Sequence, residues 1–299
     1  MKIEETNHPK EDDSKYLKRR LEEIFENIVG YPLYVEISYF SCGRDAFNWK
    51  TAKLLWENGI REMTNIPMES NELFQMMEWV CRWADGTVNI LIVEDNLKRF
   101  ARGDKEAIDG LCLHILGHIA DMDRRDHFTS FQEWAGLVDT EEESKIFSRA
   151  RDIALEYSAE KVALERGDFS SLLKAREKTS ANYEWLKSEL KVYKKGLQKV
   201  RKVEIPTRKE YVLGTSLVFL AYQMAWKKSG HREAFSKVLN TAKKKLHKIY
   251  LEMEIAEKIA PVEAQAEKYI LELEDIFNEI DLADVTAVRE VLRKYISKM

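Results

Sequence analysis

The sequence contains few residues that cross-link a chain or interrupt its regular structure. Its 299 residues include three cysteines, five prolines and 12 glycines. Cys42, Cys81 and Cys112 are odd in number and lack Cys-x-x-Cys spacing, so they predict neither a disulfide framework nor a cysteine zinc site. We therefore expect a protein of the reducing cytoplasm.

The sequence also lacks an apolar run long enough to cross a membrane. The most apolar window, residues 211–226, is shorter than the ~20 residues of a transmembrane helix and has lysines on both sides. It predicts a buried core helix. Residues 1–13 are charged and have no apolar centre of the signal-peptide type, so we expect a short flexible lead-in and no membrane partner.

The rest of the composition is that of a globular protein, with 44% hydrophobic residues, 33% charged residues and a net charge of −4. The length exceeds the ~100–200 residues of a typical single domain. The predicted fold class is α+β: a domain over residues 14–167, with a small sheet and a helix that carries the motif discussed below, precedes a mainly α-helical half over residues 168–299. Hydrophobic periodicity predicts strands at 33–40, 60–63 and 87–94, and helices at 14–29, 49–58, 71–84, 105–122 and 141–165.

The helix predicted at 105–122 carries the pattern with the clearest chemistry, His114-Ile115-Leu116-Gly117-His118. Residues four apart lie on one helix face, so both imidazole rings can reach a single metal ion. Gly117 offers a place where another backbone could approach closely. The alternative is that both imidazoles are ordinary helix residues bonded to nearby backbone or carboxylate groups.

A catalytic zinc ion takes three protein ligands, so a third ligand is expected from the next helix. Asp152, Glu156 and Glu160 recur every four residues there and share one face. Like charges at this spacing repel by ~0.2–0.5 kcal/mol per pair, which favours a cation opposite them. Glu156, in the middle, is the predicted ligand, with Asp121, Asp152 and Glu160 as alternates. Surface ion pairs with lysines or arginines of neighbouring helices are the competing explanation of the stripe.

A strand, a helix with His-x-x-x-His and a following helix with glutamates together resemble a zincin metallopeptidase whose third zinc ligand is glutamate. The resemblance covers roughly residues 14–167. The family motif is His-Glu-x-x-His, in which the glutamate takes a proton from zinc-bound water. His114 and His118 match the ligand positions, but Ile115 occupies the position of the base and cannot accept a proton. Losing general-base catalysis costs ~10²–10⁴-fold in rate, so the resemblance implies a zinc site without the ordinary peptidase activity.

The predicted helical half has a local excess of positive charge. Between residues 187 and 248 the sequence has 17 lysines and arginines against four glutamates. Such clusters can bind the phosphates of nucleic acid, but no nucleic-acid-binding motif accompanies them, and a solvated lysine face is the favoured explanation. The densest clusters are Lys191, Lys194, Lys195, Lys199, Arg201 and Lys202, and then Lys243, Lys244 and Lys245.

From residue 251 onward the chain is rich in acidic residues and carries an apolar stripe at helical spacing. The stripe spans Pro261 and predicts two long amphipathic helices suited to packing with a second copy of the chain or with a protein partner. Its members are Ile255, Ile259, Val262, Ala266, Ile270, Leu273, Phe277 and Ile280.

Three hypotheses about function follow from these patterns. The first is a catalytically impaired zincin-like protein that binds zinc and acts in binding or regulation. The second is an active metal-dependent hydrolase whose base is Asp121, Glu156 or Glu160. In the third, the chain is a helical interaction module with a nucleic-acid or protein partner, and the histidine pair is structural.

Overall fold

The computed structural model describes residues 2–5, 9–26, 34–40, 60–63, 78–83, 88–124, 140–167, 169–181, 207, 217–252 and 254–296. The chain divides into two compact units. Unit 1 comprises Met1–Asp139 and Ser158–Ala175, and unit 2 comprises Thr140–Tyr157 and Arg176–Met299. The domain boundary near residue 167 stays a prediction.

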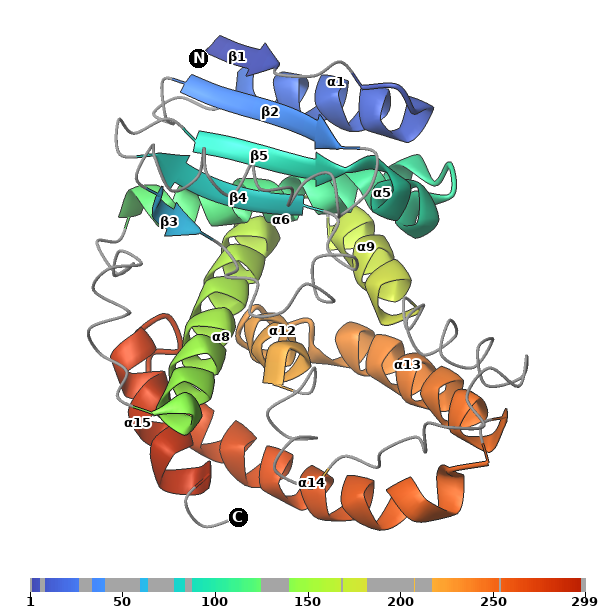
Figure 1. The fold of residues 1–299 in the computed structure, drawn as a ribbon, viewed down its shortest axis with the longest axis vertical. Coiled ribbons are helices and arrows are strands. Elements are labelled where there is room, and N and C mark those ends of the chain that lie inside the picture. Colours follow the sequence, from blue (N-terminus) through green and yellow to red (C-terminus); the bar gives the residue numbers. More distant parts are fainter. Residues whose placement is uncertain are drawn as a thin grey trace. The chain divides into compact units, whose positions relative to one another are not determined.

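A five-stranded mixed sheet forms one layer of unit 1, with the strand order β1-β2-β5-β4-β3 (Figure 1). Strands β1, β2 and β5 run parallel, whereas β4 is antiparallel to both β5 and β3. Alternate residues such as Val35 and Ile37, or Ile90 and Ile92, are fully or almost fully buried, as expected for the period of two in a strand. The strands are β1 (Lys2–Glu5), β2 (Tyr34–Phe40), β3 (Ile60–Met63), β4 (Glu78–Trp83) and β5 (Val88–Val93).

The individual strand predictions at 33–40, 60–63 and 87–94 are confirmed by β2, β3 and β5. The helix predicted at 71–84 is wrong over residues 78–83, which form β4. The spacing of Val80 and Trp83 suits a helix, but Val80 lies opposite Ile90 in the ladder with β5 and is buried there. Strand pairing therefore overrides the local periodicity. Strand β1 lies in the segment expected to be a flexible lead-in, and the helix predicted at 49–58 falls outside the described residues.

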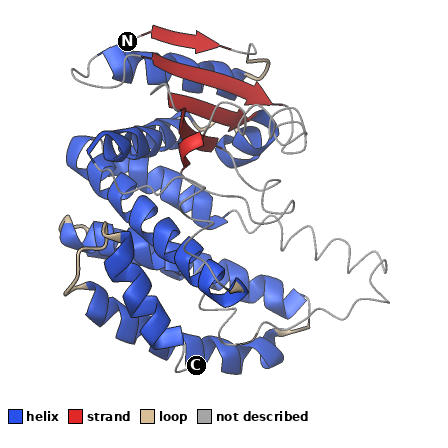
Figure 2. Ribbon diagram, turned by 60° about the vertical axis from the view of Figure 1, so that its left-hand side comes forward, coloured by secondary structure: helices blue, strands red, loops and turns tan. Residues whose placement is uncertain are grey.

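The predicted fold class, α+β, is wrong for the described part of the chain, which is mainly α-helical (Figure 2). The described strands are four to seven residues long, whereas the described helices run from eight to 26 residues. Among the described residues, every element after Val93 is a helix. The cause is the helical period of the apolar residues in the later segments, which leaves the sheet a minor layer.

Helices pack beside the sheet in unit 1. α1 contacts both α5 and α6, and α6 contacts β4. Leu17 and Leu21 of α1 are fully buried, since they repeat at a spacing of four on its apolar face. The helices predicted at 105–122 and 141–165 are confirmed, as is the helix predicted at 14–29 up to Glu26, beyond which residues 27–29 lie outside the described part of the chain. The helices of this unit are α1 (Asp12–Glu26), α5 (Glu94–Ala101), α6 (Lys105–Arg124), the second part of α8 (Glu141–Arg166) and the first part of α9 (Phe169–Ala181).

Helix α6 makes close backbone contacts at two glycines. A Cβ atom added at Gly117 would lie 2.1 Å from the carbonyl oxygen of Ala159 in α8. A Cβ atom added at Gly110 would lie 2.0 Å from the carbonyl oxygen of Ser171 in α9. The close approach expected at Gly117 is therefore confirmed, and it holds the turn that carries His118 against α8.

Unit 2 is built from helices around an aromatic core. Trp226 stacks on Phe235 with 5.5 Å between ring centroids, and both side chains are fully buried. The core helix predicted at 211–226 is α12 where the structure describes it. The helices of this unit are the first part of α8, the last part of α9, α12 (Leu217–Lys228), α13 (Arg232–Glu252), α14 (Ala256–Phe277) and α15 (Val285–Ile296). None of the helices in the described ranges is both long and apolar enough to cross a membrane.

Two carboxylates bind the helices of unit 2 together. Glu274 is buried and accepts hydrogen bonds from Gln223, Lys227 and Arg232, which links α14 to α12 and α13.

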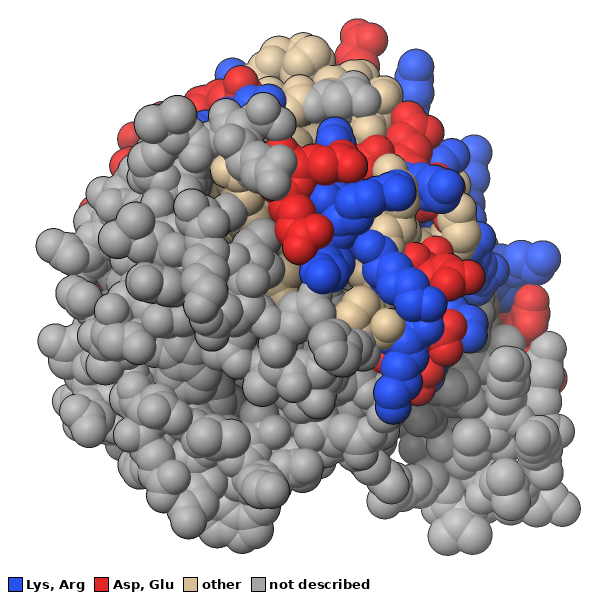
Figure 3. Space-filling model, turned by 90° about the horizontal axis from the view of Figure 1, so that it is seen from above, with Lys and Arg blue, Asp and Glu red and all other residues tan. Residues whose placement is uncertain are grey.

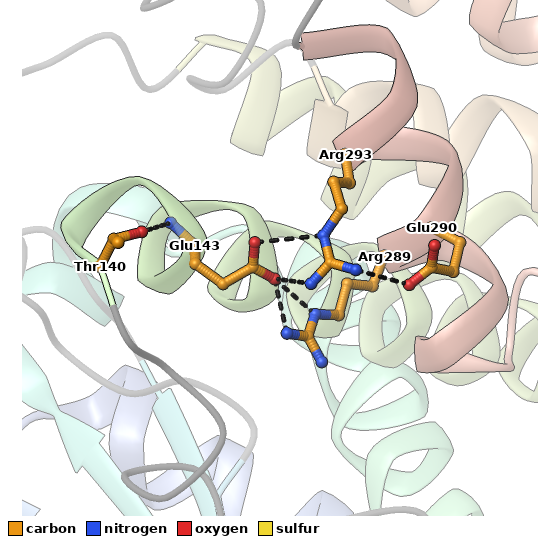
Figure 4. A network of polar contacts seen from close by, with 5 residues as sticks. All are labelled: Thr140, Glu143, Arg289, Glu290 and Arg293. Carbon is orange, nitrogen blue, oxygen red and sulfur yellow. Dashed lines mark hydrogen bonds and ion pairs between the residues drawn. The ribbon is translucent and has the colours of Figure 1, made fainter.

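Glu143, at the start of α8, accepts hydrogen bonds from Arg289 Nε at 2.7 Å and from Arg293 Nη2 at 2.7 Å, both in α15 (Figure 4). The bonds from Arg293, and then those from Arg289, hold the pKa of Glu143 below its usual value.

The predicted apolar stripe lies largely on one helix from Ala256 to Phe277, because α14 continues through Pro261, and α15 follows as the second helix of the acidic tail. Proline removes a single intrahelical hydrogen bond, and here it lies near the N-terminal end of a 22-residue helix. The predicted apolar stripe faces the core at Ile259, Ala266, Leu273 and Phe277, all of which are buried.

The contact at Gly117 leads to a stability prediction. We expect Gly117→Ala to lower the free energy of unfolding by about 2 kcal/mol or more, because the added methyl meets a backbone oxygen that cannot rotate away. This loss should exceed the ~1 kcal/mol that alanine gains over glycine inside a helix. Urea unfolding of the metal-free protein measures it. Ala264→Gly, at an exposed site of α14, is the control for the helix-propensity effect alone. A Gly117→Ala variant as stable as wild type would contradict the contact.

Candidate metal centre

Helix α6 presents two buried imidazole rings to the same point. The side chains of His114 and His118 lie one helical turn apart, and their residues are 2% and 4% exposed. The two Nε2 atoms are 3.0 Å apart. Two nitrogens that bind one zinc ion at ~2.05 Å in a tetrahedral arrangement are separated by about 3.3 Å. The pair is therefore close to the geometry that a shared metal ion requires.

Glu156 of α8 completes the set of metal-binding atoms. One ligand atom each from His114, His118 and Glu156 lie within 4.8 Å of one another, and all three residues are buried. A carboxylate movement of about 1.5 Å would bring the most distant pair to tetrahedral separation. These residues fit a metal ion, and the cluster could hold one.

The donor set defines the chemistry that such an ion would meet. Two imidazole nitrogens and one carboxylate oxygen suit zinc and other divalent transition metals, whereas calcium and magnesium prefer oxygen ligands alone. No cysteine belongs to the cluster in the described part of the chain, since Cys112 is buried and its thiol contacts the backbone oxygen of Leu17. Three protein ligands leave a fourth position for water or another small ligand.

Glu160 lies behind the first histidine. Its Oε2 atom is 3.2 Å from Nδ1 of His114, and its side chain is fully buried. A carboxylate beside Nδ1 favours the tautomer with hydrogen on Nδ1, which directs the lone pair of Nε2 toward a metal ion. Glu160, predicted as an alternate ligand, therefore lies beside Nδ1 of His114 and does not belong to the cluster of ligand atoms.

Tyr222 of α12 contacts the carboxylate that the sequence predicts as the third ligand. Its phenol donates a hydrogen bond of 2.6 Å to Oε2 of Glu156, and both residues are buried. The sequence did not identify Tyr222. The one available signal is a phenol inside an apolar helix, since a buried hydroxyl group needs a hydrogen-bond partner.

Asp152, the remaining acidic candidate whose side chain is described, does not belong to the cluster. Asp152, one turn before Glu156, accepts a hydrogen bond of 3.0 Å from Arg149. Burial, opposed by the charges of Arg149 and Arg151, raises the pKa of Asp152 to about 6. Asp121 lies on α6, and its side chain is outside the described part of the chain. Arg149 belongs to the same helix and Asp152 is buried, so this pair differs from the surface ion pairs with neighbouring helices that the competing explanation expects.

Ile115 occupies the position of the general base in the zincin motif. Its side chain is fully buried, and it carries no group that can accept a proton. The arrangement of His114, His118 and Glu156 can therefore bind a metal ion, but position 115 cannot activate a water molecule on it.

The basic clusters are described in part. Residues 191–202 fall outside the described ranges, whereas Lys243, Lys244 and Lys245 are exposed on α13, where Lys243 pairs with Glu267 at 2.6 Å. On the face seen in Figure 3, basic and acidic side chains alternate where they are described. On α1, Lys18 pairs with Glu22 in the same way. Mixed charge of this kind is typical of a solvated surface.

Comparison with known proteins adds no family to these findings. No family model matches the chain, and searches of curated proteins and of solved structures found no match either. The zincin resemblance therefore rests on the motif residues alone, and a function has to be argued from the site itself.

The raised pKa of Asp152 predicts a pH dependence. An acid whose pKa is higher in the folded state binds its proton more tightly there, so its effect on stability becomes unfavourable as the pH rises from about 4 to about 6. A difference of about two pKa units between the folded and unfolded states changes the free energy of unfolding by on the order of 3 kcal/mol across this range. Asp152→Asn should therefore become more stable relative to wild type as the pH rises through this range.

Urea unfolding of the metal-free proteins at about pH 4.5 and about pH 7.5 tests this expectation. Asp275→Asn, at an exposed position of α14, is the matched control and should show no such change relative to wild type. A difference between Asp152→Asn and wild type that is the same at both pH values would contradict it.

Proposed function

We propose that this chain is a zinc-binding, zincin-like protein that has lost the ordinary peptidase mechanism and acts in binding or regulation. The observation that carries the proposal is the convergence of His114 and His118, whose Nε2 atoms are 3.0 Å apart, on the buried carboxylate of Glu156. In this proposal the metal ion fastens α6 to α8.

Two acidic side chains of α8 lie at the histidine pair. Glu156 and Glu160 share one helix face and are 7% and 0% exposed. A divalent cation bound by the two imidazoles and Glu156 would add positive charge beside these carboxylates, which supports a metal ion at this place.

The nature of the ligands supports zinc among the divalent metals. Zinc accepts two histidines and a glutamate, and it tolerates a compact site with few ligands. The carboxylate of Glu160 beside His114 is the kind of partner that commonly orients a zinc-bound histidine. When bound, zinc would supply Lewis acidity to any molecule in the fourth position.

The absence of a base at position 115 argues against peptide hydrolysis by the usual route. Glu156 would be a metal ligand, and Glu160 lies beside His114. Neither carboxylate therefore lies where a glutamate at position 115 would lie. General-base catalysis accounts for ~10²–10⁴-fold in rate. A metal ion that chiefly holds two helices together is therefore the better supported role.

Metal binding is the first test of the proposal. We expect untagged wild-type protein, stripped of metal, to bind about one equivalent of zinc. His118→Ala and Glu156→Ala each remove a ligand and should weaken binding by more than the ~10–100-fold typical of groups that only orient a ligand. Isothermal titration with zinc gives both stoichiometry and affinity.

His247→Ala, which removes an exposed histidine of α13, is the matched control and should bind zinc as wild type does. The proposal is wrong if wild type binds no zinc, or if the His118→Ala and His247→Ala variants have equal affinity while circular dichroism shows both to be folded.

An assay of peptide hydrolysis distinguishes a protein that has lost the peptidase mechanism from a hydrolase that uses another general base. We expect no turnover of unstructured peptides by the zinc-loaded wild type, because Ile115 cannot take a proton from metal-bound water. Ile115→Glu should introduce hydrolysis. Ile115→Gln should not, because glutamine has the size of glutamate but cannot act as a base. Wild-type turnover that disappears in Glu156→Ala would instead identify an active hydrolase with another base.

A further inference from the structure

The contact between Tyr222 and Glu156 is short and shielded from water. The phenol oxygen lies 2.6 Å from Oε2 of Glu156, within the ~2.5–2.7 Å of hydrogen bonds from a hydroxyl group to a charged oxygen. Tyr222 is 6% exposed and Glu156 is 7% exposed. Such a bond holds one oxygen of the carboxylate in a fixed direction.

Three neighbouring side chains pack around the ring of Tyr222. The guanidinium of Arg176, a buried residue of α9, lies 4.0 Å from the ring centroid. Phe219 and Phe235 each approach the ring edge to face, at 6.4 Å between centroids. Groups from α9, α12 and α13 therefore determine where the phenol lies, and all of them belong to unit 2, as does Glu156.

We propose that Tyr222 is a positioning residue of the metal centre. Its phenol donates a hydrogen bond to Oε2 of Glu156 and so leaves Oε1 as the single oxygen that binds the ion. This inference rests on the proposed function, because it assigns the coordination mode of the same ion. A carboxylate whose second oxygen accepts a strong hydrogen bond binds a metal through one oxygen, whereas an unrestrained carboxylate can also bind through both. Tyr222 therefore keeps the coordination number low.

A purely structural tyrosine would behave differently from a positioning residue. If Tyr222 merely fills the core and satisfies a buried carboxylate, removing its hydroxyl lowers stability and leaves the metal site unchanged. If it positions Glu156, the same change alters both the affinity for the metal and the geometry around it. Tyr222→Phe separates these cases, since it keeps the ring between Arg176, Phe219 and Phe235.

The test compares zinc affinity and cobalt spectra of wild type and Tyr222→Phe. We expect the zinc dissociation constant of Tyr222→Phe to rise by about 10–100-fold, as for the loss of a group that orients a ligand. We also expect the visible absorption of the cobalt-substituted variant to weaken, because binding through two oxygens raises the coordination number. Tyr250→Phe, which removes the hydroxyl of another buried tyrosine of unit 2, should leave both properties as in wild type.

A double-mutant comparison identifies Glu156 as the group through which Tyr222 acts. On a Glu156→Gln background, Tyr222→Phe should cause no comparable further loss of zinc affinity. Wild type that binds zinc while Tyr222→Phe binds it equally tightly, with an unchanged cobalt spectrum, would overturn this inference and leave the proposed function intact. Lower stability with unchanged affinity would overturn it in the same way. Wild type that binds no zinc would overturn both.

Discussion

The candidate site depends on the close contact between the backbone of α6 and the backbone of α8. Gly117 has no space for a Cβ atom, which would lie 2.1 Å from the carbonyl oxygen of Ala159. Ala159 is the neighbour of Glu160, whose carboxylate lies 3.2 Å from His114. Because Gly117 lies between the two histidines on α6, the approach of the backbones brings both imidazoles to the carboxylate face of α8. Any larger residue at position 117 would force the histidines away from that face.

The three carboxylates of the acidic stripe of α8 have different partners although they repeat at one spacing. Asp152 pairs with Arg149, and burial raises its pKa to about 6. Glu156 joins the histidine cluster and accepts the phenol of Tyr222, while Glu160 contacts the other side of His114. The stripe therefore consists of buried groups with specific partners, in contrast to the partly exposed charges that pair with one another on α1. Buried carboxylates need specific partners, whereas exposed carboxylates are solvated by water.

Local patterns predicted the parts of the structure that depend on local spacing. The strands at β2, β3 and β5, the helix that carries the histidines and the close approach at Gly117 follow from periodicity and residue size. The fold class does not follow from local patterns, since the short strands make up less of the described chain than the helices do. In addition, β4 is a strand because of its pairing with β5. The contact of Tyr222 with Glu156 could not be predicted either, because it joins residues 66 positions apart. Spacing within α8 identified its carboxylates as candidates, but only tertiary contacts show that Glu156 belongs to the histidine cluster and that Glu160 lies beside Nδ1 of His114.

The proposed metal ion lies between His114, His118 and Glu156. A crystal structure of zinc-loaded protein, with anomalous data collected on both sides of the zinc absorption edge, locates it directly. We expect one strong anomalous peak about 2.0–2.2 Å from both Nε2 atoms and from one carboxylate oxygen of Glu156. A map with no peak there, with the two imidazoles still in direct contact, would contradict it.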